Sequence, residues 1–85
     1  MRRRITTLDN ILPRESAVVQ SIAIGGELQR RLEEMGLVAG TRVECVGRSP
    51  AGDPAAYLVR GAVIAIRADD CRGIYVETVE SEAEE

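Results

Sequence analysis

The sequence predicts a small, mainly β domain: a partly open β-barrel of about five strands, with one short α-helix inserted after the first strand. Short stretches of alternating apolar residues recur along the chain between turn-forming residues, which is typical of short strands. One stretch, residues 25–40, has helical spacing instead. The 85 residues leave room for one core, and closing short strands into a barrel removes exposed sheet edges.

Composition restricts both the core and the partners. Apolar residues make up 45% of the chain, but Phe and Trp are absent, so Val, Ile, Leu and Ala must fill the core. The formal net charge is −3, and all eleven basic residues are Arg. We interpret the missing Lys as compositional bias rather than as a recognition signal. With this acidic balance, nucleic acid is not an expected partner.

The charges gather at the two ends of the chain. Arg2-Arg3-Arg4 opens it, and five glutamates lie within residues 77–85. We therefore expect a flexible Arg-rich N-terminus (1–7), one domain (8–79) and a flexible acidic tail (80–85). No apolar run follows the first arginines, as a signal peptide requires, and no stretch approaches the roughly 20 apolar residues of a membrane span. These features favour a cytoplasmic protein without membrane insertion.

Two elements are expected before the helix. Residues 5–13 suit a helical turn around Leu8 and Ile11 that ends at a proline. The following segment, residues 17–24, is rich in β-branched side chains, but its apolar positions change parity after Val19. A β-bulge produces such a slip, so we predict a bent strand there.

The sequence contains a signal for the C-terminal end of the helix. Leu28, Leu32 and Met35 form a narrow apolar stripe along it. Gly36 can adopt a left-handed conformation, and Leu37 would then fold back onto the helix, as in a Schellman motif. The segment therefore predicts one short helix that docks on the barrel and covers one opening.

A turn and a strand are expected after the helix. Residues 38–41 suit a type II turn with Gly40 at positive φ. Residues 41–47 alternate, with Val43 and Cys45 on the inward side. A loop over residues 48–54 then follows because turn formers are dense there.

The clearest local signal is a β-hairpin around Gly61-Ala62. Gly in the first loop position favours a type II′ turn between strands 55–60 and 63–67. This register pairs Val59 with Ile64 and Tyr57 with Ile66 on one face. The opposite face would carry Ala56, Leu58, Ala65 and Arg67. A polar turn over residues 68–71 and a last strand over 73–79, with Ile74 and Val76 inward, complete the barrel.

No catalytic site, metal site or cofactor is expected. The sequence has no His, which excludes Ser-His and Cys-His arrangements. Cys45 and Cys71 fall at inward positions, where Cys behaves as a small hydrophobe rather than as half of a metal site. In a chain without a secretion signal, both are expected to be free thiols. Asp69 and Asp70 suit a solvated turn.

One surface signal indicates a partner protein. Leu58, Val63 and Tyr75 are expected to point outward beside two alanines, with Arg60 and Arg67 at the rim. Apolar patches with a polar rim mark protein–protein interfaces. Barrels that bind single-stranded nucleic acid use aromatic rings as stacking platforms, and this sequence offers little aromatic surface. A protein is therefore the favoured partner.

The order of these signals resembles the ferrous iron transport protein A family. The matching runs are Gly-Gly with Leu-Gln-Arg-Arg-Leu-Glu-Glu-Met-Gly-Leu, then Ala-Gly-Thr-Arg-Val-Glu, Ser-Pro-Ala-Gly-Asp-Pro, Val-Arg-Gly and Ala-Ile-Arg. They cover the chain from about Leu8 to Val79. The resemblance implies an SH3-like barrel with a helix after the first strand. It also implies a small bacterial protein with an accessory or regulatory role in ferrous iron uptake, without established catalysis.

The partner that the resemblance implies is a membrane-embedded ferrous iron permease with its own cytosolic GTP-binding domain. Contact with this permease would recruit the chain to the inner face of the membrane. The same barrel occurs in metal-dependent repressors, so transcriptional regulation or nucleic-acid binding is the alternative. Metal carriage is a third interpretation, in line with a family-level association with transition metals, and would use exposed carboxylates such as Asp53. The oligomeric state stays open.

Carrying the resemblance over residue by residue yields two sets of positions. Five are structural, at turns: Gly36, Gly40, Gly52, Pro54 and Gly61. The positions expected to contact a partner, with those of the apolar patch, are Arg31, Glu34, Asp53, Leu58, Arg60, Val63, Arg67 and Tyr75. The chain departs from the family at Ala39, where Pro is usual, and at Ala51, where a larger aliphatic residue is usual.

Overall fold

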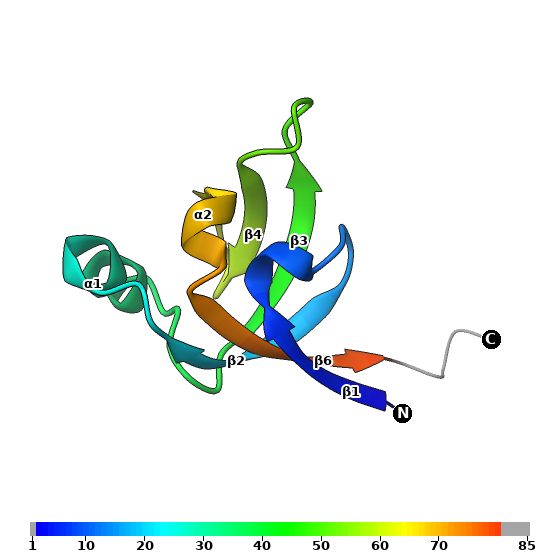
Figure 1. Cartoon of the computed structure of the whole chain (residues 1–85), viewed down its shortest axis with the longest axis horizontal. Coiled ribbons are helices and arrows are strands. Elements are labelled where there is room, and N and C mark those ends of the chain that lie inside the picture. The colour runs from blue at the N-terminus through cyan, green and yellow to red at the C-terminus, as the bar shows by residue number, and fades with distance from the viewer. Residues whose placement is uncertain (1, 81–85) are drawn as a thin grey trace.

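A computed structural model describes residues 2–80 of the chain (Figure 1). The expected acidic tail, 80–85, lies outside these residues apart from Glu80. None of the helices in the described part has the length and hydrophobicity needed to cross a bilayer. The elements are β1 (Arg2–Thr7), the 3₁₀ helix η1 (Leu8–Asn10), β2 (Ser16–Ile22), α1 (Gly26–Glu34), β3 (Arg42–Arg48), β4 (Ala55–Val59), β5 (Ala62–Ile66), α2 (Ala68–Cys71) and β6 (Ile74–Glu80).

The strands form one antiparallel sheet in the order β1-β6-β2-β3-β4-β5. Figure 1 shows them curling around one core, while α1 stands out to one side. The mainly β architecture with a short helix is as predicted. The described residues contain six strands rather than about five, so the helix follows the second strand.

The additional strand, β1, occupies the N-terminal segment that was expected to be flexible. It pairs with β6 along its whole length, from Arg2 opposite Glu80 to Thr7 opposite Tyr75. The sequence pattern conceals this strand because its large apolar side chain, Ile5, is 60% exposed and contributes nothing to a buried face. Backbone hydrogen bonds to β6, rather than apolar burial, therefore hold β1 in the sheet.

A helical turn precedes β2 as predicted, but it covers only Leu8–Asn10; residues 5–7, which were expected to belong to it, are part of β1. η1 buries Leu8, and Ile11, which follows it, is also fully buried. In β2, Ala17 and Val19 are buried, and the pairing with β6 changes register between Val19 and Ser21. The predicted bulge is therefore present.

The end of α1 has the predicted Schellman pattern. Gly36 has φ of 103°, and the Leu37 N–H donates to the Leu32 carbonyl at 2.9 Å. The Gly36 N–H donates to the Glu33 carbonyl at 3.0 Å. Leu32 and Leu37 are buried, whereas Met35, the last residue of the predicted apolar stripe, is 44% exposed. Met35 is already the C-cap, so the chain turns away there and Leu37 takes the core position.

The β4–β5 hairpin lies where the sequence predicts it, but the predicted register was wrong. The turn residues are Arg60 and Gly61, with φ of 49° and 84°, instead of Gly61 and Ala62. Tyr57 consequently pairs with Ile64. Positive φ at both central residues is typical of a type I′ turn, whose twist matches that of the flanking strands. Because the shift is two residues, the predicted inner and outer faces are retained.

The core consists mainly of Val, Ile, Leu, Ala and Cys side chains, as expected. Tyr57 is fully buried among them. The predicted turn glycines Gly40, Gly52 and Gly61 all have positive φ, and the Asp53-Pro54 peptide bond is cis. The polar turn that was expected before the last strand is one turn of helix, α2, which returns Cys71 to the core.

Candidate interaction surface

The outer faces of β4 and β5, together with one residue of β3, carry a group of apolar side chains. Alternation along each strand turns these side chains away from the core, and the register places Leu58 opposite Val63 and Ala56 opposite Ala65. Val63 is 63% exposed. We call this area the β3–β5 face; its apolar residues are Val46, Ala56, Leu58, Val63 and Ala65. Four of these five side chains, all except Val46, share one surface as predicted from the sequence.

Val46 is not among the residues that were predicted for this surface. It lies at the irregularity of β3, where Cys45 pairs with Tyr57 but Gly47 pairs with Ala56, and its side chain is 43% exposed. The alternation that puts Cys45 inward already predicts that Val46 points outward. The alternation in the sequence therefore indicated the outward direction of Val46, one residue beyond Cys45.

Tyr75, by contrast, does not belong to the β3–β5 face. It lies on β6, opposite Thr7 and Ser21, and β2 and β3 separate β6 from β4 in the sheet. Its side chain does point outward and is 41% exposed, as predicted. Alternation indicates the side of the sheet on which a residue lies, but it does not indicate strand order. The predicted contact between Tyr75 and the hairpin was therefore wrong.

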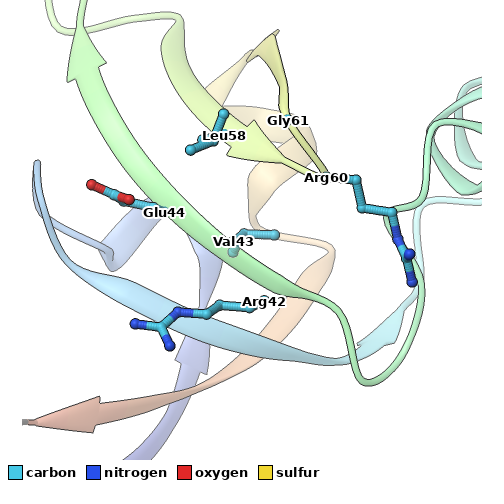
Figure 2. A pocket seen from close by; sticks show the side chains of 6 residues that line it. All are labelled: Arg42, Val43, Glu44, Leu58, Arg60 and Gly61. Atoms are coloured by element: carbon cyan, nitrogen blue, oxygen red, sulfur yellow. The ribbon is translucent and has the colours of Figure 1, made fainter.

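A cationic pocket adjoins the β3–β5 face at the turn of the hairpin (Figure 2). It has a volume of about 320 Å³ and is lined by Arg42, Val43, Glu44, Leu58, Arg60 and Gly61. Glu44 lies opposite Leu58 across the strand pair, and Figure 2 shows both side chains on the same side of the ribbon. The charged lining residues are two arginines and one glutamate, so the pocket is cationic and suits an acidic group next to an aliphatic one. Figure 2 shows the Arg42 and Arg60 side chains extending in opposite directions from it.

The two arginines of this pocket are free to bind. Both Arg42 and Arg60 are exposed, and neither guanidinium group makes a hydrogen bond or an ion pair to another residue within 2–80. Arg60 was predicted as a contact residue, whereas Arg42 was not. Outward alternation along β3 indicates the direction of Arg42, but its proximity to Arg60 follows only from the pairing of β3 with β4.

Arg60 also joins the hairpin to the end of α1. A Cβ atom built on Gly36 would clash with Cδ of Arg60 and lie 2.9 Å from its Nε. Glycine at position 36 thus leaves the space that the Arg60 side chain fills. Figure 2 shows this side chain extending from the hairpin toward the segment that follows α1. The stop of the helix therefore helps to set the direction of a pocket residue.

The remaining predicted contact residues lie on α1 or next to the beginning of α2. Arg31 and Glu34 are exposed on α1, and no hydrogen bond or ion pair within the described residues joins them to the β3–β5 face. Asp53 has a local role, because its Oδ1 accepts a hydrogen bond from the Ala68 N–H, the first of α2, at 2.9 Å. Arg67 precedes α2 as its N-cap residue and is exposed.

The inner side of β4 contains a buried polar contact. The Cys71 thiol donates to the Tyr57 hydroxyl at 3.6 Å, and that hydroxyl donates to the Leu8 carbonyl at 3.3 Å. Burial is the main cause that raises the pKa of Cys71 to about 11, with Asp9, Asp70 and Asp53 adding to it, and burial also raises the pKa of Tyr57. The thiol is therefore protonated at neutral pH, which suits a core residue rather than a nucleophile or metal ligand.

Cys45 is also a free, buried thiol, and no group of three or more metal-ligating side chains occurs within residues 2–80. The described residues thus provide an apolar face, a cationic pocket and a closed core.

The barrel places the protein in the class of small SH3-like β-barrel domains. The FeoA domain model matches residues 6–78, and the chain belongs to this family.

Solved structures support the same assignment. FeoA from Chlorobium tepidum has a TM-score of 0.85 and 28% identity, over 93% of this chain and 76% of that one. Zinc-bound FeoA from Stenotrophomonas maltophilia, described as an SH3 domain protein and as a candidate ferrous iron transport activating factor, has a TM-score of 0.73 and 31% identity, over 84% of this chain and 88% of that one. Comparison with curated proteins gives no match.

A manganese-dependent transcriptional repressor has the same fold, with a TM-score of 0.76 over 93% of this chain and 44% of the repressor. Its identity to this chain is 12%, so the likeness concerns the fold alone. The family and the SH3-like barrel that the sequence analysis inferred by resemblance are confirmed. Membership of the family implies a role in ferrous iron transport.

Proposed function

We propose that this protein is a non-catalytic accessory or regulatory module of ferrous iron uptake, and that it acts by direct contact with a membrane-embedded permease that has a cytosolic GTP-binding domain. In this proposal the β3–β5 face and the cationic pocket form the contact surface. Binding recruits the protein to the inner face of the membrane. In this proposal the protein acts through contact alone, without chemistry of its own.

The observation that supports this proposal is the apolar pair of Leu58 and Val63 on one surface, next to a turn that carries Arg60. The two apolar side chains face each other across β4 and β5, and the turn between these strands carries the arginine. Interfaces commonly have an apolar centre that buries anchors and a charged rim that sets orientation. The rim here is cationic at the pocket, so an acidic surface of the permease is the expected counterpart.

Binding to the permease, reconstituted in lipid nanodiscs from the same organism, tests the proposal. Leu58→Asp and Arg60→Glu should each raise the dissociation constant at least about tenfold, because interface anchors commonly contribute more than about 1.4 kcal/mol. Tyr75→Asp is the matched control, since Tyr75 is also an outward side chain but lies on β6. If wild type does not bind, with GTP, with GDP or without nucleotide, the proposal fails.

The alternative is a regulatory module that binds nucleic acid. It predicts retention on duplex DNA with a steep loss of affinity as salt rises, because each phosphate contact releases counterions. The net charge of −3 weighs against it. The same protein preparation, titrated with DNA at two salt concentrations, distinguishes this alternative from permease binding.

A further inference from the structure

Strand β5 lies at an open edge of the sheet. It is last in the strand order and pairs with β4 alone among the described strands. Val63 is 63% exposed, and Ala62 and Ala65 are exposed as well. The edge is therefore accessible.

The backbone of β5 offers free hydrogen-bonding groups along this edge. Val59 and Ala62 flank the two-residue turn, so the backbone N–H and C=O groups of Ala62 point toward β4. The backbone groups of every second residue after Ala62 also point toward β4. The N–H and C=O groups of Val63 and Ala65 consequently point away from β4. No other backbone hydrogen bond within residues 2–80 uses them. We call these four groups the β5 edge.

The two edges of the sheet differ in a way that favours pairing at β5. Charged side chains, prolines and bulges normally protect an edge strand from pairing with another chain. The opposite edge strand, β1, begins Arg-Arg-Arg. β5 reads Ala-Val-Ile-Ala-Ile, without charge or proline, and its register to β4 has no irregularity. An unprotected edge strand of this composition is a template for an added strand.

The charges around β5 indicate the chemistry of that strand. Arg60 precedes β5 and Arg67 follows it, and both are exposed without an ion pair inside the described chain. A second copy of this chain fits poorly, because antiparallel pairing of two β5 strands would bring Arg60 of one copy beside Arg67 of the other. Acidic residues near the two ends of an extended segment would instead complement both arginines.

We propose that the β5 edge binds an extended segment of the partner protein as a seventh strand, with acidic residues near both ends and small or β-branched residues between them. This inference rests on the proposed function, because it names the part of the permease that the barrel would recognise. The backbone of the added strand supplies affinity, and the flanking acidic side chains supply orientation. The neighbouring β3–β5 face then contacts the side chains of the added strand.

Ala65→Pro tests the inference because it removes an N–H that points to the open edge, a position where a sheet tolerates proline. Ala65→Ser keeps that N–H and is the matched control. We expect Ala65→Pro to bind the reconstituted permease at least about tenfold more weakly than Ala65→Ser, because both variants alter the side chain on the β3–β5 face but only the proline loses the hydrogen bond and blocks the edge. If circular dichroism shows that the proline variant is unfolded, hydrogen exchange of the Val63 and Ala65 amides in the wild-type complex takes its place, since an added strand must slow it.

Synthetic 12-residue peptides that tile the cytosolic segments of the permease identify the strand. The binding peptide should carry acidic residues near both ends and should slow hydrogen exchange of the Val63 and Ala65 amides. Full binding of Ala65→Pro to the permease overturns the inference and leaves the proposed function intact. Absence of binding by wild type overturns both, so the two failures are distinguishable. Binding by a peptide that leaves these amides unprotected also overturns the strand-addition inference.

Discussion

The side chain of Arg60 fills the space directly above Gly36, so the turn of the β4–β5 hairpin and the end of α1 are in contact through a residue without a Cβ atom. The two residues are far apart in sequence, and each has an unusual backbone, with φ of 49° for Arg60 and 103° for Gly36. The helix stop therefore contributes to the cationic pocket as well as to the fold.

Replacing Gly36 with Ala should disturb both the fold and the cationic pocket. The positive φ strains any residue with a Cβ, which we expect to lower the free energy of unfolding by roughly 1 to 3 kcal/mol. The new methyl group should also displace the Arg60 side chain. Gly40→Ala is the control, because Gly40 has φ of 92° but nothing within 4 Å of a built Cβ. Thermal unfolding should show similar losses for both variants. The NMR signal of the Arg60 Nε–H should move only in Gly36→Ala.

Changing Arg60 to Asn should separate stability from function. Asn tolerates the left-handed conformation better than Arg, and Asn-Gly is a preferred pair for a type I′ turn, so the variant should be more stable by about 0.5 to 1 kcal/mol. It also lacks the guanidinium, so its affinity for the permease should fall. Urea unfolding and the nanodisc binding assay provide the two readouts. A variant that is less stable than wild type would contradict the turn assignment.

Removing the carboxylate of Asp53 should destabilise α2. Asp53→Ala leaves the first N–H of α2 without its acceptor, and losing such a cap typically costs about 0.5 to 2 kcal/mol. Asp53→Asn keeps an acceptor oxygen and should retain most of the stability, as thermal unfolding can show. The same variant tests whether the charge contacts the partner, as the sequence analysis predicts: if Asp53→Asn folds normally but binds the permease weakly, the charge does contribute.

The buried thiol of Cys71 predicts a loss of stability in alkali. Its pKa is raised to about 11 from an ordinary 9.0, so the folded state retains a proton that the unfolded state loses first. The associated stabilisation is complete below about pH 9 and disappears as the pH rises through 11, amounting to roughly 2 to 3 kcal/mol. Urea unfolding between pH 7 and 11 measures it. Cys71→Ala, although less stable overall, should show a flatter profile between pH 9 and 10.

Local patterns in the sequence accounted for the parts of the structure that local interactions determine. The spacing of Leu28, Leu32 and Gly36 predicted the helix and its stop, because a Schellman motif involves neighbouring residues only. The parity change after Val19 predicted the bulge. Alternation around Leu58 and Val63 placed most of the β3–β5 face correctly, and it would have included Val46.

Interactions between distant segments accounted for what was missed. β1 carries no inward apolar pattern and exists because β6 has a free side to pair with. Tyr75 was assigned to the wrong neighbourhood because no local feature fixes the strand order. The turn at Arg60 was also misplaced, since a glycine at 61 suits more than one hairpin geometry, and the space above Gly36 that admits the Arg60 side chain lies in another segment.

The position of β6 has a consequence for the order in which the chain can fold. β6 is the last strand in sequence, yet it lies between β1 and β2 in the sheet. As the chain leaves the ribosome, β2 to β5 can pair with their sequence neighbours, whereas β1, the first strand made, has no partner until β6 has been synthesised. Completion of the barrel must therefore wait for the C-terminal strand, and until then the inward side of β2 lacks the Ile74 and Val76 side chains that cover it in the finished domain.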